Sequence, residues 1–499
     1  MDAVKLIKPS LFLIATYIAV STTGVIPLVS YFVLLYLALL SSSYVYKLTE
    51  PHKKIVFILS TAAIATYGLL LRYIDKIELW GDETNVIRIA NLPFGDIARS
   101  VATSHVAVPP LDYWNMWVWK YVVSLIETPE VAFRLPYMAY HIAAAVCFAL
   151  IFTKVGNKLV PVVAFLVYFF NPLLFLYSLE VRYYALTALG STLILFLHIN
   201  NVLFELRFLP LLLLLGLNSV FLYLLLIPFA FFYVLKNPKH LIPVGFFAIS
   251  FFIIYPLLLV SPQIERSKTL GLIIIAFKQL ITLQLPQTFH VGFFVLAVVI
   301  AVISKSWFQQ KLSILVSIIF SVIAISSLAY YKGYFDFFVR HYLFIVPLII
   351  YFLLIPLKSL SNRYRAIYLL LLLSIFVFPW INYDLNSLKQ GNLYSKSPLG
   401  VREIYRTTID NEAALIIAPN ERSVLSPPVY DFYTSNIIWY STYYPSVEML
   451  RVKSTDEICA LLEKGQRVVV VNVIGPTACN ASPYYRAFES RGLHIIVPI

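Results

Sequence analysis

The chain has 499 residues, of which 60% are apolar and only 13% are charged. A typical soluble domain is about 45–50% apolar and about 25% charged, and even a large one leaves about a quarter of its surface exposed to water. This composition excludes cytosolic enzymes, nucleic-acid-binding proteins and disordered scaffolds, and it predicts a polytopic α-helical membrane protein. The net charge of +13 then reflects membrane topology and contacts with lipid headgroups, so no nucleic-acid partner is expected.

The apolar runs predict about 12–13 transmembrane helices, since one span needs roughly 20 residues. Lys5 and Lys8 precede the first run, which lacks a small-residue cleavage site and is therefore expected to stay uncleaved. The stretch 204–235 is interrupted around Gly216, Leu217 and Asn218 and predicts two short helices with a turn between them. The other spans are expected near 9–24, 26–46, 54–73, 131–153, 158–177, 181–198, 241–260, 287–304, 312–331, 339–357 and 366–383.

Lysine and arginine placement predicts an N-terminus on the inner side of the membrane, because inner loops are enriched in these residues. With this orientation every expected inner loop is basic. The loops carry Lys47, Lys53, Lys54, Lys154, Lys158, Arg207, Lys236, Lys239, Lys305, Lys311, Lys358, Arg363 and Arg365. The outer side then receives the loop 74–130, the turn 178–181, the loop 261–286, the turn 332–338 and the tail from about residue 385.

The outer loop 74–130 predicts two amphipathic helices, Asn85–Ser100 and Asp112–Ile126. Trp114, Trp117 and Trp119 fall in the second, and tryptophans gather at membrane–water interfaces. We therefore expect both helices to lie in the outer interface. The alternative is a simple solvated loop.

The tail 385–499 has a different composition, with prolines, polar stretches and short β-type runs at 414–418 and 467–473. The segment 454–464 between them is typical of a helix, and the alternation predicts a small extracytoplasmic α/β domain. Outside the cell, Cys459 and Cys479 could form a disulfide; the alternative is two unpaired thiols. The chain is thus expected to divide into a transmembrane catalytic domain, 1–384, and a soluble domain, 385–499.

Charged residues gather on the expected outer face, where each needs a physical reason because charge near a membrane is costly. They are Asp82, Glu83, His105, Asp112, Arg134, Glu180, Arg182, Arg340 and His341. Singly, each has a structural explanation: a helix cap for Asp82, a local ion pair for Glu180 with Arg182, and headgroup contacts for Arg340 with His341. Together they fit an enzyme whose cations hold an anionic lipid and whose carboxylate acts as a general base.

Asp82 and Glu83 are adjacent, and neighbours on a helix do not share a face. Only one of them is therefore expected to reach the substrate directly. We assign that role to Asp82 as catalytic base and give Glu83 a supporting role; the reverse order is the alternative.

These segments resemble the GT-C class of integral-membrane glycosyltransferases, which includes protein O-mannosyltransferases and lipid A aminoarabinose transferases. The acidic pair Asp82-Glu83 opens the first large outer loop, as in the family. Pro109-Pro110-Leu111-Asp112-Tyr113-Trp114 is similar to the family's proline-proline segment, with His105 four residues before it instead of a histidine or lysine directly before it. The resemblance continues through Arg134-Leu135-Pro136, the segment from Ser178 to Leu186 with Glu180, Arg182 and Tyr183, and Arg340-His341-Tyr342.

The resemblance implies sugar transfer, with inversion, from a polyprenyl-phosphate donor to a lipid, glycan or protein acceptor at the outer face. Arg134, Arg182 and Arg340 would meet the phosphate, and Glu180, Tyr183, His341, His105 and Asp112 would line the substrate site. No metal is required, although Asp82, Glu83 and Glu180 could bind a divalent cation. The alternatives are a flippase or transporter of lipid-linked saccharides, an oligosaccharide polymerase or ligase, and a structural scaffold.

Overall fold

The computed structural model describes a long helical part and several short strands. The described residues are 4–21, 24–74, 79, 81–103, 109–123, 126, 129–153, 159–254, 270–276, 288–303, 308–332, 339–376, 405, 408–409, 414–417, 449–451, 468–471, 485–490 and 493–498. The chain forms two compact units. The first contains residues 1–71 and 89–384, and the second contains residues 72–88 and 385–499.

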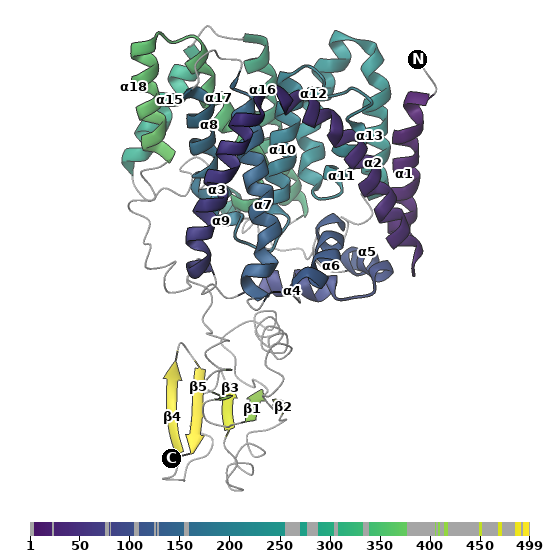
Figure 1. Ribbon diagram of the computed structural model, residues 1–499, viewed down its shortest axis with the longest axis vertical. Helices are drawn as coiled ribbons and strands as arrows, with labels where there is room; N and C mark the ends of the chain where they lie inside the picture. Colours follow the sequence, from purple (N-terminus) through teal and green to yellow (C-terminus); the bar gives the residue numbers. More distant parts are fainter. Residues whose placement is uncertain are drawn as a thin grey trace. The chain divides into compact units, whose positions relative to one another are not determined.

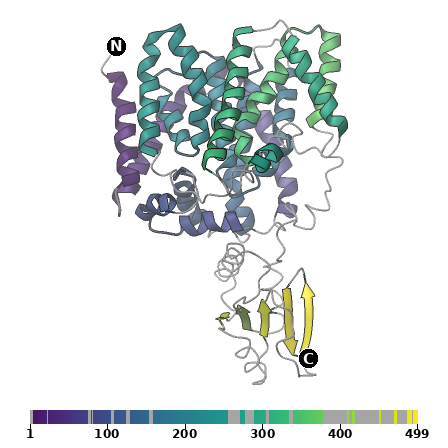
Figure 2. The ribbon, with the colours of Figure 1, turned by 180° about the vertical axis from the view of Figure 1, so that it is seen from behind.

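The long helices of the first unit run side by side in one bundle (Figures 1 and 2). The elements are α1 (Val4–Ser21), α2 (Ile26–Thr49), η1 (Glu50–His52), α3 (Lys53–Ile74), α4 (Gly81–Ala90, shared with the second unit), α5 (Phe94–Thr103), α6 (Leu111–Val123), α7 (Pro129–Leu150), α8 (Leu159–Phe169), α9 (Pro172–Tyr177), α10 (Tyr184–Ile199), α11 (Leu209–Gly216), α12 (Val220–Lys236), η3 (Pro238–His240), α13 (Leu241–Ile254), α15 (Thr288–Ile303), α16 (Phe308–Lys332), η5 (Val339–Ile345), α17 (Val346–Leu354), η6 (Ile355–Lys358) and α18 (Asn362–Phe376). Every predicted span overlaps at least one of these helices, although several boundaries differ by a few residues.

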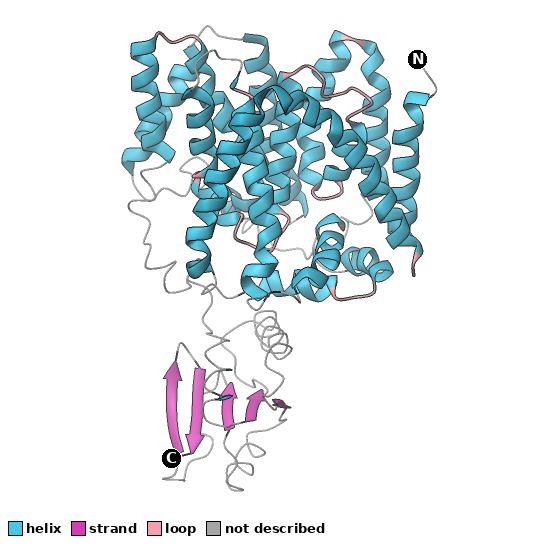
Figure 3. Cartoon of the chain, viewed as in Figure 1, coloured by secondary structure: helices cyan, strands magenta, loops and turns pink. Residues whose placement is uncertain are grey.

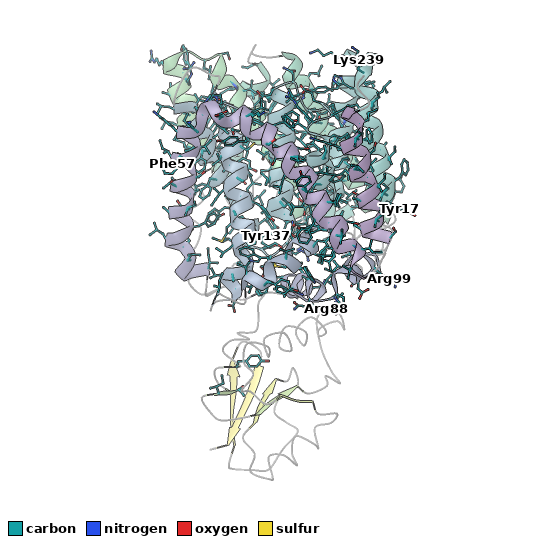
Figure 4. All side chains as sticks on the ribbon, turned by 45° about the vertical axis from the view of Figure 1, so that its right-hand side comes forward. Tyr17, Phe57, Arg88, Arg99, Tyr137 and Lys239 are labelled. Carbon is teal, nitrogen blue, oxygen red and sulfur yellow. The ribbon has the colours of Figure 1, made fainter. Side chains whose placement is uncertain are left out.

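The bundle has the surface of a helical membrane protein. Tyr17 and Phe57 point outward from it and are 60% and 72% exposed (Figure 4). Among the described residues, four helical segments are long and apolar enough to cross a membrane: Ile26–Leu71, Glu130–Leu150, Leu312–Tyr331 and Arg340–Leu357. Arg99 on α5 and Lys239 lie at opposite ends of the bundle (Figure 4).

The short helices α5 and α6 lie at one end of the bundle, where α5 packs against α1 and α2, and α6 packs against α7 (Figure 1). The single helix predicted over 85–100 is wrong, because α4 ends at Ala90 and α5 begins at Phe94. Pro93 lacks an N–H and disfavours the helical conformation of the residue before it, which explains the break. The second predicted helix, 112–126, corresponds to α6. Its Trp117 indole N–H donates to the carbonyl oxygen of Leu92 at 3.1 Å.

Two further breaks bring polar groups into the interior. The predicted span 158–177 divides into α8 and α9 at Asn171, which has an extended backbone before Pro172 and accepts a 3.1 Å hydrogen bond from the Leu174 N–H. The predicted interruption of 204–235 is confirmed, because α11 ends at Gly216 and α12 begins at Val220.

The close approach of α11 and α12 gives a testable consequence at Gly216. A Cβ atom there would lie 2.7 Å from the Tyr223 hydroxyl, and that hydroxyl is held by a 2.6 Å hydrogen bond with Ser250. Overpacking of this kind costs about 1–3 kcal/mol, so Gly216→Ala should lower the thermal unfolding midpoint in detergent. Gly245→Ala is the matched control, since nothing lies within 4 Å of its Cβ position. Equal midpoints for the two variants would contradict this packing.

The second unit contains the strands of the chain's C-terminal part, drawn in magenta in Figure 3. A parallel sheet has the order β2-β1-β3, and β4 pairs with β5 in an antiparallel hairpin. The strands are β1 (Ala414–Ile417), β2 (Met449–Arg451), β3 (Val468–Val471), β4 (Tyr485–Ser490) and β5 (Leu493–Pro498). β1 and β3 fall within the segments predicted as strands. The predicted helix 454–464 and both Cys459 and Cys479 lie outside the described residues.

Candidate functional site

The buried turn between α9 and α10 is the centre of the candidate site. Glu180 is 3% exposed and Arg182 is 7% exposed, and the Arg182 N–H donates to the Glu180 carbonyl oxygen at 2.8 Å. The Arg134 side chain on α7, itself 1% exposed, donates through Nε to the Leu179 carbonyl oxygen at 2.6 Å. The Arg134 guanidinium therefore holds the turn against α7.

Two arginines from distant parts of the sequence meet at the ring of Tyr184, the first residue of α10. The guanidinium carbon of Arg182 lies 5.7 Å from the ring centroid, and that of Arg340 lies 6.0 Å from it. Both distances are within cation–π range. Tyr177 and Tyr183 pack on the same ring, with centroids 5.2 Å and 4.5 Å from it. Arg182 and Arg340, which are more than 150 residues apart in the sequence, thus both lie beside this cluster of three tyrosine rings.

Asp112 on α6 joins this group from another direction. Its side chain is 2% exposed, accepts a 3.0 Å hydrogen bond from the Tyr137 hydroxyl on α7, and is attracted electrostatically by Arg182. Tyr137 lies inside the bundle (Figure 4). We call Asp112, Tyr137, Glu180, Arg182, Tyr184 and Arg340 the arginine–carboxylate cluster.

Burial raises the pKa of the Asp112 carboxyl to about 7, although the Tyr137 hydrogen bond and the Arg182 charge both lower it. Tyr140 is a further titratable group that interacts with this carboxyl. An unfolded aspartate has a pKa of about 3.9. The folded protein therefore holds the Asp112 proton more tightly, and the stability from this group falls as the pH rises from about 4 to about 7.

The Asp112→Asn variant tests this titration. Wild-type protein should unfold at a lower temperature at pH 8 than at pH 5.5, because the buried carboxylate must be ionised at the higher pH. Asparagine can still accept the Tyr137 hydrogen bond but cannot ionise, so the variant should lose most of the difference. The measurement is the thermal midpoint in detergent at both pH values. A variant with the full wild-type difference would show that Asp112 does not titrate in this range.

The break between α11 and α12 connects the parts of the site. The Leu217 carbonyl oxygen accepts a 3.2 Å hydrogen bond from the Leu111 N–H at the start of α6. The Asn218 side-chain amide donates to the Tyr183 carbonyl oxygen, just before α10, at 3.0 Å. These hydrogen bonds join the starts of α6 and α10 to the break that precedes α12, and the dipole of each helix adds positive partial charge at its N-terminus.

The outcome for the predicted site residues differs between the two units. Asp112, Arg134, Glu180, Arg182, Tyr183 and Arg340 come together in the first unit, and His341 contacts Phe221 of α12 with ring centroids 5.9 Å apart. Asp82 and Glu83 are in the first turn of α4, in the second unit. Glu83 is 1% exposed. The Asp82 side chain and His105 lie outside the described residues.

Sequence reasoning missed Tyr137, Tyr184 and Asn218. Tyr137 follows Arg134 by three residues, so the two share a face of α7. This spacing could have indicated that Tyr137 lies near the site. Asn218 is a polar residue between two apolar runs, which marked the break but not its contacts. Among the described residues no group of three or more His, Cys, Asp or Glu side chains could hold a metal ion. Comparison with models of known protein families and with curated proteins found no match.

Proposed function

We propose that the chain is a GT-C-type integral-membrane glycosyltransferase. It transfers a monosaccharide from a polyprenyl-phosphate lipid to a lipid, glycan or protein acceptor, with inversion at the anomeric carbon. The observation that carries the proposal is the convergence of Arg182 and Arg340 on the ring of Tyr184.

A phosphate is the ligand that this arrangement favours. Arginine binds phosphate through paired, charge-assisted hydrogen bonds, and helix N-termini add to the attraction for an anion. Arg182 and Arg340 are assigned to the phosphate. Arg134 is assigned a positioning role, because its Nε already donates to the Leu179 carbonyl oxygen. Asp112 sits beside Arg182 and, when ionised, competes with the phosphate for it.

The reaction needs one base and one stabilised leaving group. The acceptor hydroxyl oxygen attacks the anomeric carbon as Asp82 takes the hydroxyl proton. The bond between that carbon and the phosphate oxygen breaks, and its electron pair leaves with the polyprenyl phosphate. The two arginines stabilise the negative charge that grows on the phosphate. The products are the glycosylated acceptor and the free polyprenyl phosphate.

The proposed topology has about 12–13 spans, with the N-terminus inside and both the site and residues 385–499 outside. The basic connections support it, as does the position of Lys239 at the opposite end of the bundle from α5 (Figure 4). A transporter would instead place charged residues near the membrane midplane. Among the described residues of the first unit, the buried Asp, Glu, Lys and Arg side chains are Asp112, Glu130, Arg134, Glu180 and Arg182, all in or next to the cluster.

The experiment that tests the proposal measures release of free polyprenyl phosphate. Purified protein in nanodiscs receives a panel of polyprenyl-phosphate monosaccharides with a membrane glycan extract as acceptor, with and without Mg²⁺. Release that depends on one particular sugar is expected. Folded protein that releases nothing from any of these donors would contradict the proposal. Turnover of a diphosphate-linked oligosaccharide would then indicate a polymerase, and lipid movement without release would indicate a transporter.

A further inference from the structure

The break between α11 and α12 contains two buried polar side chains whose hydrogen-bonding capacity is not used. Asn218 is 0% exposed and Ser219 is 2% exposed. The Asn218 amide nitrogen donates to the Tyr183 carbonyl oxygen at 3.0 Å and to the Thr187 hydroxyl at 2.9 Å. Because a carbonyl oxygen can only accept, these contacts fix the amide orientation, and Asn218 Oδ1 must point elsewhere.

Neither Asn218 Oδ1 nor Ser219 Oγ has a hydrogen-bond partner among the described residues. Ser219 stands at the N-cap of α12, but its side chain makes no capping hydrogen bond. Leaving a buried polar group unsatisfied costs about 1–3 kcal/mol. Native proteins leave few such groups, and a bound ligand or an ordered water commonly satisfies them.

The two unused oxygens adjoin the arginine–carboxylate cluster. Asn218 bonds the backbone of Tyr183, the residue after Arg182. Leu217 bonds the backbone of Leu111, the residue before Asp112. Phe221, in the first turn of α12, contacts the His341 ring beside Arg340. The break is therefore adjacent to the residues assigned to the phosphate.

We infer that Asn218 and Ser219 form a subsite for the hydroxyl groups of the transferred sugar; this inference rests on the proposed function. Asn218 Oδ1 can only accept a hydrogen bond, so it suits a ligand that donates one. A sugar hydroxyl donates and accepts, whereas an ionised phosphate has no proton to donate. The hydroxyls of a sugar attached to the phosphate would satisfy both oxygens.

The test compares two lipids that differ only in the sugar. Binding of polyprenyl phosphate and of the polyprenyl-phosphate monosaccharide used by the enzyme is measured in nanodiscs for wild type, Ser219→Ala and Asn218→Ala. Loss of one hydrogen bond corresponds to about a 3- to 10-fold loss of affinity. Ser219→Ala should lose that much for the sugar lipid and stay within about twofold for polyprenyl phosphate. Asn218→Ala should lose at least as much for the sugar lipid.

Ser317→Ala is the matched control, because Ser317 is a buried serine on α16 whose hydroxyl bonds the Ser313 carbonyl oxygen. Ser219→Ala removes no capping bond, so it remains informative if Asn218→Ala fails to fold. Equal losses for both lipids would assign Ser219 to the phosphate and overturn the subsite. If the wild type prefers the sugar lipid and both variants keep the preference, only the subsite fails. A wild type that binds neither lipid overturns the proposed function and the subsite with it.

Discussion

Replacing Asp82 with Asn should lower the turnover of the polyprenyl-phosphate-sugar donor about 10²–10⁴-fold, the usual contribution of a general base. Asparagine has the shape of aspartate but cannot take the acceptor proton. Asp82 is in the first turn of α4, and the burial of Glu83, at 1% exposed, suits the supporting role given to that neighbour. The measurement is the rate of polyprenyl phosphate release in nanodiscs.

Asp96→Asn is the matched control for this variant, because Asp96 is a half-buried aspartate on α5, the next helix along the chain. It should keep wild-type turnover. Glu83→Gln separates the two members of the acidic pair, and it should lose less activity than Asp82→Asn. Full turnover by a folded Asp82→Asn protein would show that Asp82 is not the general base. Asp112 would then be the next candidate for that role.

Replacing Arg182 with Ala should raise the KM for the donor about 10- to 150-fold, the range that corresponds to 1.5–3 kcal/mol for hydrogen bonds to a charged group. The guanidinium lies over Tyr184, and Arg340 contacts the same ring. The KM for the acceptor should change much less, because the assigned partner of Arg182 is the donor phosphate. Initial rates over a matrix of donor and acceptor concentrations separate the two constants.

Arg182→Lys should recover only part of the loss, since lysine keeps the charge but not the planar, paired donors. Arg99→Ala is the control, because Arg99 is an exposed arginine on α5 (Figure 4). Removal of a buried charge can itself destabilise the protein, so the thermal midpoint is measured beside the kinetics. A rise confined to the acceptor KM would contradict the assigned role.

The helices could largely be predicted from the sequence because their signal is the length and continuity of apolar runs. The misplaced boundaries involve local backbone chemistry. Pro93 and Pro172 each divide a segment that composition alone predicts as continuous. A hydropathy window averages over many residues and is insensitive to a single missing backbone N–H group. Such helix breaks must therefore be predicted from prolines and from possible helix caps such as Asn171.

The candidate site could be predicted in its charged residues but not in its neutral ones. Arg182, Arg340 and Asp112 are conspicuous because charge is rare in this chain. Tyr184 is one of 35 tyrosines, and nothing in its local sequence indicates that its ring contacts two arginines. The contact between Tyr184 and Arg340 depends on the packing of α10 against η5. Tertiary packing of this kind cannot be predicted from the residues next to Tyr184 or Arg340 in the sequence.

The most direct test of the central claim is a cryo-electron-microscopy map of the protein in nanodiscs with bound polyprenyl phosphate. Phosphate density is expected within hydrogen-bonding distance of the Arg182 and Arg340 guanidinium groups, at the N-termini of α10 and α12. Phosphate density elsewhere, with Arg182 and Arg340 contacting only protein groups, would contradict it.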